Sequence, residues 1–187
     1  MGRRPSGSDG AGRPAPSAMS QSHPEQIVAA RESALRLLAV RERSAAELRA
    51  RLRTRGFDPA VVEETLERVA SAGLQSDVRF AERFAQDVGG ARGWSSRRTR
   101  SELLGRGLSR ELAEAATEAQ DPEDERERAR AVALRQARKM AGLASQARIR
   151  RLAGLLARRG YDADVCRSVA LEVAAETASD VEEEGIP

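Results

Sequence analysis

The chain of 187 residues has very few of the side chains that form disulfides, catalytic sites or thick hydrophobic cores. Cys166 is its only cysteine, which excludes a disulfide within the chain and leaves a thiolate zinc site short of ligands. His23 is its only histidine and lies among small and polar residues, where we expect it to be solvated rather than catalytic. Aromatic residues make up 3% of the chain, which favours thin seams of Leu, Ala and Val between helices over one thick core.

Long apolar runs are also missing. No stretch approaches the roughly 20 residues that are needed to span a bilayer, and the N-terminus lacks the hydrophobic segment of a secretion signal. Together with the single cysteine, these features predict a soluble, cytoplasmic protein with no membrane partner. Lys139 is the only lysine, so arginine supplies almost all of the positive charge behind the net charge of +3.

The abundant residues are Ala, Leu, Arg and Glu, which favour helices because their side chains lose little rotamer freedom in a helical turn. The composition therefore predicts an all-α fold. Residues 1–26 are rich in Gly, Pro, Ser and Arg, and we expect them to form a disordered N-terminal tail. Residues 178–187 are expected to form an acidic, frayed C-terminal tail.

A short pattern recurs three times at intervals of about fifty residues. Each copy consists of Arg, Gly, a hydrophobic residue and a capping residue, at Arg55–Asp58, Arg106–Ser109 and Arg159–Asp162. A leucine stands before each glycine and an apolar residue after it, at matched distances: Leu52, Leu103, Leu156, Val61, Leu112 and Val165. This agreement predicts three tandem three-helix repeats, at 27–74, 75–121 and 122–177, in an elongated, curved array.

Capping residues place several helix ends. Ser44 with Glu47 three residues later predicts a capping box, and Asp58 followed by Pro59 predicts the next helix start. The glycines of the three repeats are expected to follow helix ends in the left-handed backbone conformation: Gly56, Gly107 and Gly160.

No arrangement of residues typical of catalysis is present in the sequence. Cys166 shares a repeat column with Val62 and Ala113, which predicts a small core residue, and no histidine in the repeats could serve as its base. The glycines at 89–93 follow no predicted strand, which argues against a phosphate-binding loop. We therefore expect no enzyme, no cofactor and no metal site.

Basic residues are the remaining signal, because no acidic residue lies between Arg128 and Tyr161. The stretch is either a solvated helical surface or an electrostatic footprint for nucleic acid or an acidic protein groove. Its spacing predicts that Arg135, Arg138 and Lys139 share one helix face, and that Arg148 and Arg151 share another. With a second patch at 97–100, the candidate binding residues are Arg97, Arg98, Arg100, Arg135, Arg138, Lys139, Arg148, Arg150, Arg151, Arg158 and Arg159.

Trp94 precedes the second patch and could stack on a nucleic-acid base. The single Trp of a small helical domain is more often a core residue, and we favour that interpretation. Arg79 stands beside acids and is expected to form a structural ion pair instead of a binding contact.

Each of the three repeats carries short sequence motifs, and their order and spacing along the chain match those of a known family. The first repeat carries Leu37–Arg41, then Ser44 and Glu47-Leu48. The middle repeat is the most specific, and its motifs are Gly73-Leu74, Asp77–Ala81, Phe84, Glu102-Leu103 and Gly107–Ser109. The third repeat ends in Leu155–Tyr161. In this order and spacing the chain, over roughly residues 31–175, resembles the RecX family of RecA regulators, although residues 87–94 carry fewer charges than the family's basic run.

The resemblance implies a monomer that binds the RecA–DNA filament, contacts DNA within it and mainly inhibits RecA. Filament extension, recombinase, ATPase and coprotease activity would be limited, in DNA repair, homologous recombination and the SOS response. The residues themselves leave two alternatives, which are a stand-alone helical DNA-binding protein and a helical adaptor for an unrelated protein. Binding to bare DNA at physiological salt would favour the first of these.

Overall fold

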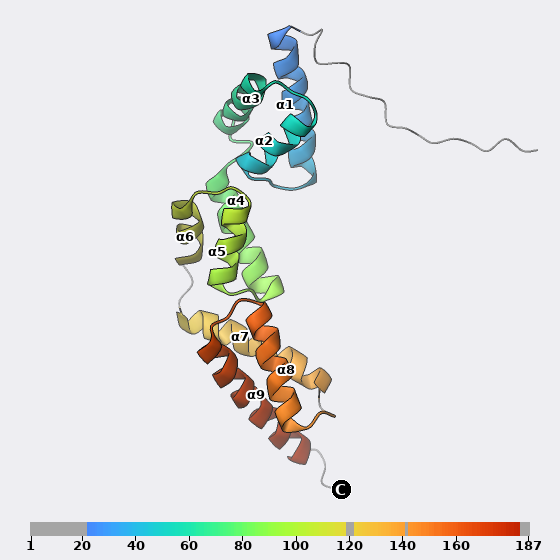
Figure 1. Ribbon diagram of the computed structural model, residues 1–187, viewed down its shortest axis with the longest axis vertical. Coiled ribbons are helices and arrows are strands. Elements are labelled where there is room, and N and C mark those ends of the chain that lie inside the picture. The colour runs from blue at the N-terminus through green and yellow to red at the C-terminus, as the bar shows by residue number, and fades with distance from the viewer. Residues whose placement is uncertain (1–21, 119–121, 141, 184–187) are drawn as a thin grey trace, which may run out of the picture. The chain divides into compact units, whose positions relative to one another are not determined.

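The computed structural model describes residues 22–118, 122–140 and 142–183, and every regular element in these ranges is helical (Figure 1). The prediction of an all-α fold with three tandem three-helix repeats is confirmed. The helices are α1 (His23–Val40), α2 (Ala45–Thr54), α3 (Pro59–Ser71), α4 (Asp77–Asp87), α5 (Ser96–Gly105), α6 (Arg110–Glu118), α7 (Pro122–Ala137), α8 (Ser145–Arg158) and α9 (Ala163–Glu183). A π-helical turn, η2 (Val88–Arg92), follows α4, and a 3₁₀ turn, η3 (Arg138–Met140), follows α7.

The first of two compact units contains the described residues up to Arg41 together with Leu48–Leu74. Its core is a seam of small and medium apolar side chains between α1, α2 and α3, as the scarcity of aromatic residues predicts. The buried residues are Ala34, Leu37, Leu48, Leu52, Val62, Leu66 and Val69.

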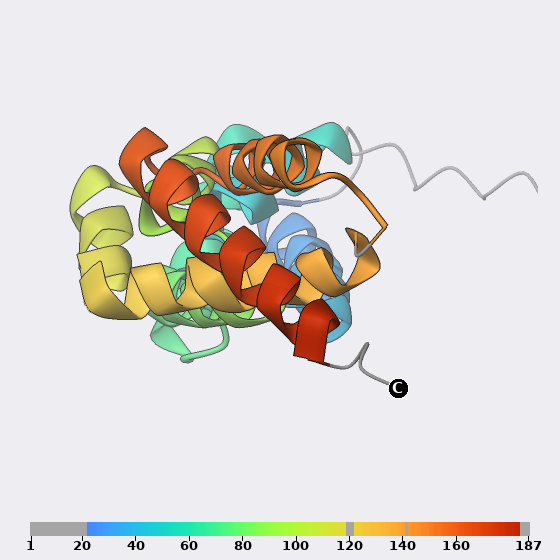
Figure 2. The same ribbon diagram turned by 90° about the horizontal axis from the view of Figure 1, so that it is seen from below.

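The second unit contains Glu42–Glu47 and the residues from Gln75 onwards. In its last repeat α8 and α9 both pack on α7, and Figure 2 shows α9 (red) crossing α7 (yellow to orange). Alternating Ala and Val let these helices approach closely. The buried residues of this repeat are Ala129, Val132, Ala133, Ala137, Leu152, Leu156, Tyr161, Cys166, Val169, Ala170 and Val173.

The repeated glycine turn has the predicted geometry. Gly56, Gly107 and Gly160 have φ angles of 85°, 79° and 91°, so each ends its helix in the left-handed conformation. The leucine column is fully buried, at 0% exposure in each repeat. The apolar residue after each glycine is less regular, because Val61 is buried while Leu112 and Val165 are half-buried, and the next column provides the core residue in all three repeats.

Within the second unit, each glycine turn lies against the start of an earlier helix. Ser44 donates from Oγ to the carbonyl of Arg106 at 2.7 Å, and the amide of Ser95 donates to the carbonyl of Arg159 at 3.0 Å. The same contact is therefore made twice in the chain, once by a hydroxyl and once by an amide. At these two turns a Cβ on the glycine would lie 2.4 Å from Cβ of Ala46 at Gly107 and 2.6 Å from Cβ of Arg98 at Gly160.

Alanine at Gly160 should therefore cost more stability than alanine at Gly56. Both changes strain a left-handed backbone, at about 1 kcal/mol, but only a Cβ at Gly160 would lie 2.6 Å from Cβ of Arg98, whereas one at Gly56 meets nothing within 4 Å. Overpacking adds about 1–3 kcal/mol. Urea unfolding of the two variants measures the difference, and equal midpoints would contradict the close approach of the turn.

Two expected boundaries differ from the structure. Helix α1 begins at His23, four residues before the start predicted at 27, because Ser22 and Glu25 form a capping box. His23 is exposed, as expected, and its Nε2 lies 3.0 Å from Oε2 of Glu64. At the other end α9 continues to Glu183, past the tail predicted to begin at 178. Residues 1–21 and 184–187 of the predicted tails lie outside the described residues.

Candidate functional site

The third repeat carries most of the exposed positive charge among the predicted site residues. Six of those in the third repeat are exposed, and none of the six has an ion pair within the described part of the chain. They come from the end of α7, from η3 and from α8 and are Arg135, Arg138, Lys139, Arg150, Arg151 and Arg158. We call this set the basic face of the third repeat.

Arg135 and Arg138 line one groove, described below, whereas Lys139 is not among its lining residues. Helix α7 ends at Ala137, and Arg138 and Lys139 belong to the next turn, η3.

Arg148 is the clearest error among the predicted site residues. It was placed with Arg151 on an exposed face, but it is 6% exposed. Its guanidinium donates to Oγ1 of Thr177 at 2.8 Å and to the carbonyl of Leu143 at 3.4 Å. Arg148 therefore holds the start of α8 to α9 and is not available to a partner.

The predicted second patch is also structural, because each of its arginines has a partner inside the protein. Arg97 donates to the carbonyl of Gly160 at 3.1 Å, and Arg98 donates to the carbonyl of Arg158. Arg100 donates to Oγ1 of Thr117 at 3.2 Å. These side chains hold α5 to α6 and to the glycine turn of the third repeat. Arg79, as expected, pairs with Glu42 at 3.5 Å.

Trp94 is half-buried, and its ring is already in contact with protein groups. The ring packs edge-to-face on Phe84, with centroids 6.3 Å apart. The guanidinium carbons of Arg92 and Arg98 lie 5.3 and 4.3 Å from the ring centroid, in cation–π contact. These contacts favour the structural interpretation of Trp94 over base stacking, although the residue is not in the core.

Arg159, another predicted site residue, is half-buried at the junction of the second and third repeats. Burial lowers the pKa of its guanidinium, and the like charges of Arg135, Arg158 and Arg98 lower this pKa further. The guanidinium groups of Arg135, Arg158 and Arg98 therefore repel that of Arg159.

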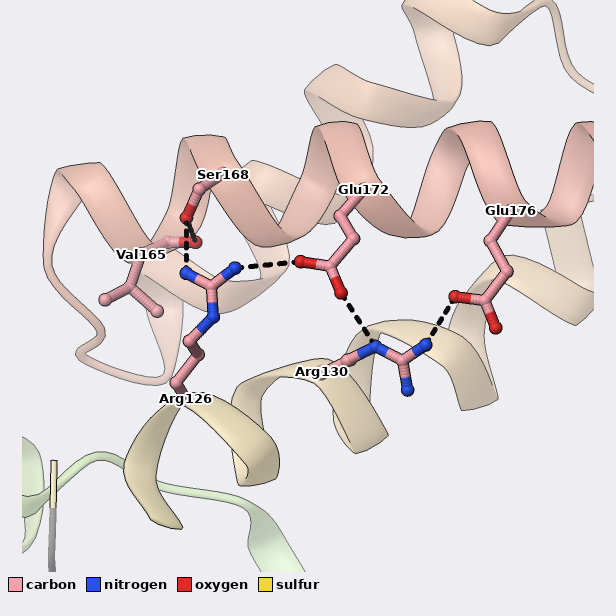
Figure 3. A network of polar contacts seen from close by, with 6 residues as sticks. All are labelled: Arg126, Arg130, Val165, Ser168, Glu172 and Glu176. Carbon is pink, nitrogen blue, oxygen red and sulfur yellow. Dashed lines mark hydrogen bonds and ion pairs between the residues drawn. The ribbon is translucent and has the colours of Figure 1, made fainter. Parts of the chain in front are cut away.

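Helix α9 neutralises two arginines of α7, one just before the acid-free stretch and one within it (Figure 3). Arg126 donates to Oε2 of Glu172 at 2.9 Å, and Arg130 bridges Glu172 at 2.9 Å and Glu176 at 2.6 Å. We call this set the α7–α9 ladder. The two arginines are spaced i,i+4 on α7, as are the two glutamates on α9, so each pair lies on one helix face. Since a helix turns by 100° per residue, Arg126 and Arg130 lie on the opposite side of α7 from Arg128 and Arg135.

Residues of the basic face line parts of two grooves. The first, the α8 groove, has a volume of about 680 Å³ and combines three arginines with an apolar floor, and it is lined by Gln136, Met140, Ala147, Arg150, Arg151, Gly154, Leu155 and Arg158. The second, the glycine groove, has a volume of about 410 Å³ and lies between η2 and α7. Its lining residues are Gly89, Gly90, Gly93, Arg128, Ala131, Val132, Leu134, Arg135 and Arg138. The sequence pattern did not predict that these glycines face arginines 40 or so residues later in the chain.

The described residues offer few other reactive groups. Cys166 is a buried core residue, as predicted, and burial raises the pKa of its thiol. The described ranges contain no group of three or more His, Cys, Asp or Glu side chains that could hold a metal ion. In the same ranges, none of the helices combines the length and hydrophobicity that crossing a membrane requires.

Comparison with known proteins gives a consistent result for all three repeats. The RecX first, second and third three-helix domains match residues 30–68, 76–116 and 123–169. The regulatory protein RecX of Corynebacterium efficiens is 36% identical over 162 residues, covering 84% of this chain and 77% of the relative. That of Mycobacterium avium is 37% identical over 165 residues, covering 87% and 94%.

Solved structures share the fold at lower identity. The crystal structure of RecX from Lactobacillus salivarius matches with a TM-score of 0.69 and 16% identity, covering 81% of this chain and 99% of that one. A second crystal structure of a regulatory protein RecX gives a TM-score of 0.68 at 18% identity, covering 78% and 73%. With three matched domains and more than a third of the aligned positions identical to those of two regulatory proteins RecX, the chain belongs to the RecX family.

Proposed function

We propose that this protein regulates RecA in the cytoplasm by binding the RecA–DNA filament through the basic face of its third repeat. Binding limits filament extension and the activities that depend on the filament, in DNA repair and recombination. Family membership supports a regulatory role, since the relatives are named regulatory proteins. The observation that carries the mode of binding is the set of six exposed basic side chains without ion pairs in the described part of the chain.

The physical argument is electrostatic. A filament of protein wound on DNA presents phosphates and acidic side chains, and a cluster of arginines is attracted to both. The α7–α9 ladder ties the acids of α9 to Arg126 and Arg130, so these carboxylates do not neutralise Arg150, Arg151 or Arg158. The basic face therefore keeps its charge for a partner.

The decisive measurement is the DNA-dependent ATPase activity of RecA with increasing amounts of this protein. A regulator that blocks filament growth should suppress the activity at well below one molecule per RecA, because each bound molecule stops the addition of many subunits. Unchanged activity at equimolar protein would contradict the proposal. Tight binding to bare DNA at physiological salt, with no effect on RecA, would favour a stand-alone DNA-binding protein.

A further inference from the structure

The glycine groove has two unlike walls. One wall is formed by η2 and the residue after it and includes Gly89, Gly90 and Gly93, of which Gly89 and Gly93 are buried. Gly90 is exposed, and a Cβ at this position would meet nothing within 4 Å. A Cβ at Gly93 would lie 2.3 Å from Cγ2 of Val132, so η2 packs directly against α7. Gly90 therefore leaves the main chain accessible at this point of the groove.

The other wall supplies positive charge. Arg128, Arg135 and Arg138 line it, and no carboxylate is among the lining residues. Arg128 lies beside the hydroxyl of Tyr161, while Arg135 and Arg138 are exposed and have no ion pair in the described ranges. A nearby carboxylate, that of Glu125, accepts a hydrogen bond from the amide of Ser96 at 3.1 Å.

Anions, and oxyanions in particular, suit such a groove. Guanidinium groups form forked hydrogen bonds to phosphate oxygens, and a glycine wall lets a phosphate approach main-chain groups closely. The like-charge repulsion at Arg159, to which Arg135 contributes, would be relieved by a bound anion.

The shape of the groove distinguishes between a small anion and a polymer. Its volume of about 410 Å³ exceeds that of one phosphate group, and both Arg135 and Arg138, which line it, are exposed. A chain of regularly spaced phosphates would contact successive cations along this path, whereas a free phosphate ion would contact only some of them.

We propose that the glycine groove is a binding site for the phosphate backbone of a DNA strand, held by Arg135 and Arg138 against the glycine wall. This inference rests on the proposed function for its biological setting. It adds to that function by assigning the DNA contact to one groove. The α8 groove, with its apolar floor, would make other contacts.

Gly90→Glu tests this site, because it adds a carboxylate to the glycine wall where space is open. We expect it to weaken binding of a labelled single-stranded oligonucleotide at least about tenfold, measured by fluorescence anisotropy without RecA. The salt dependence should become shallower, with a decrease of about 0.7 in slope for each phosphate contact that is lost. Inorganic phosphate should compete only weakly, because it cannot span several cations.

The matched control is Gly105→Glu, which makes the same charge change at an exposed glycine of α5 that also has open space around it and lies outside both grooves. It should bind the oligonucleotide as the unmodified protein does. Equal affinities for Gly90→Glu and Gly105→Glu would overturn the site. If Gly90→Glu fails to fold by circular dichroism, Arg135→Gln with Arg138→Gln provides the same comparison, and unchanged affinity in that variant would overturn the site equally.

The RecA ATPase measurement separates this inference from the proposed function. Suppression of the ATPase by the unmodified protein, combined with no oligonucleotide binding, would reject the glycine groove as a DNA site and leave RecA regulation intact. Oligonucleotide binding that is sensitive to Gly90→Glu, with no effect on RecA, would support the site and reject the proposed function.

Discussion

Arg148→Glu is expected to destabilise the protein by about 3–5 kcal/mol, because it places a carboxylate where a buried guanidinium now lies. Arg148 is 6% exposed, and it donates to Thr177 and to the carbonyl of Leu143. A carboxylate could not donate to that carbonyl, and it would remain buried without a cation. Since domains are stable by only about 5–15 kcal/mol, much of the folded population would be lost on mild heating or in low urea.

Arg151→Glu is the control for this change. Arg151 belongs to the same helix but is exposed and has no ion pair within the described residues. Reversing its charge should alter the unfolding free energy by about 0.5 kcal/mol or less. Urea unfolding followed by circular dichroism measures both variants, and similar midpoints for the two would mean that Arg148 is solvent-accessible in the folded protein.

Reversal of Arg150 and Arg151 together should reduce affinity for RecA–DNA filaments by an order of magnitude or more, without loss of the fold. Both side chains line the α8 groove. If they contact phosphates, the slope of log affinity against log salt should also fall by roughly 0.7–0.9 for each contact. If they contact acidic side chains of RecA, affinity falls while the slope changes less, so the salt titration identifies the type of partner group.

The control for this double variant is Arg31→Glu with Arg36→Glu in α1. Both residues are exposed, and Arg36 has only an i,i+4 pair with Glu32 at 3.6 Å. The net charge changes by the same amount as in the test variant. Equal loss of filament affinity in the two variants would show that total charge, and not the basic face, determines binding.

The sequence predicted the fold in considerable detail because the signals are local. A C′ glycine, an N-cap and an i,i+4 apolar spacing each act within one or two turns, and they recur three times. Asp58 caps α3 at the amide of Ala60, at 2.8 Å, as its position before Pro59 indicated. Ser44 likewise accepts from the amide of Glu47 at 3.1 Å.

The site was less predictable because burial and pairing depend on contacts that are distant in sequence. The spacing of Arg148 and Arg151 is correct for one broad face, yet α9 covers only Arg148, through Thr177, which lies 29 residues later. Arg130 was counted as part of an uninterrupted basic stretch, but Glu172 and Glu176 neutralise it across 42 and 46 residues. A count of charges along the chain cannot show which of them a neighbouring helix compensates.

The α7–α9 ladder also affects how the protein meets its partner. It gathers acidic groups on one side of α7, while the arginines of the glycine groove lie on the opposite side. The third repeat therefore has an electric dipole moment, and the field of a polyanion exerts a torque on that dipole before any contact is made. Rotation in this field would turn the arginines toward the filament during the approach, so that fewer encounters are unproductive. The association rate should rise at low ionic strength and fall as the Debye length shortens with added salt.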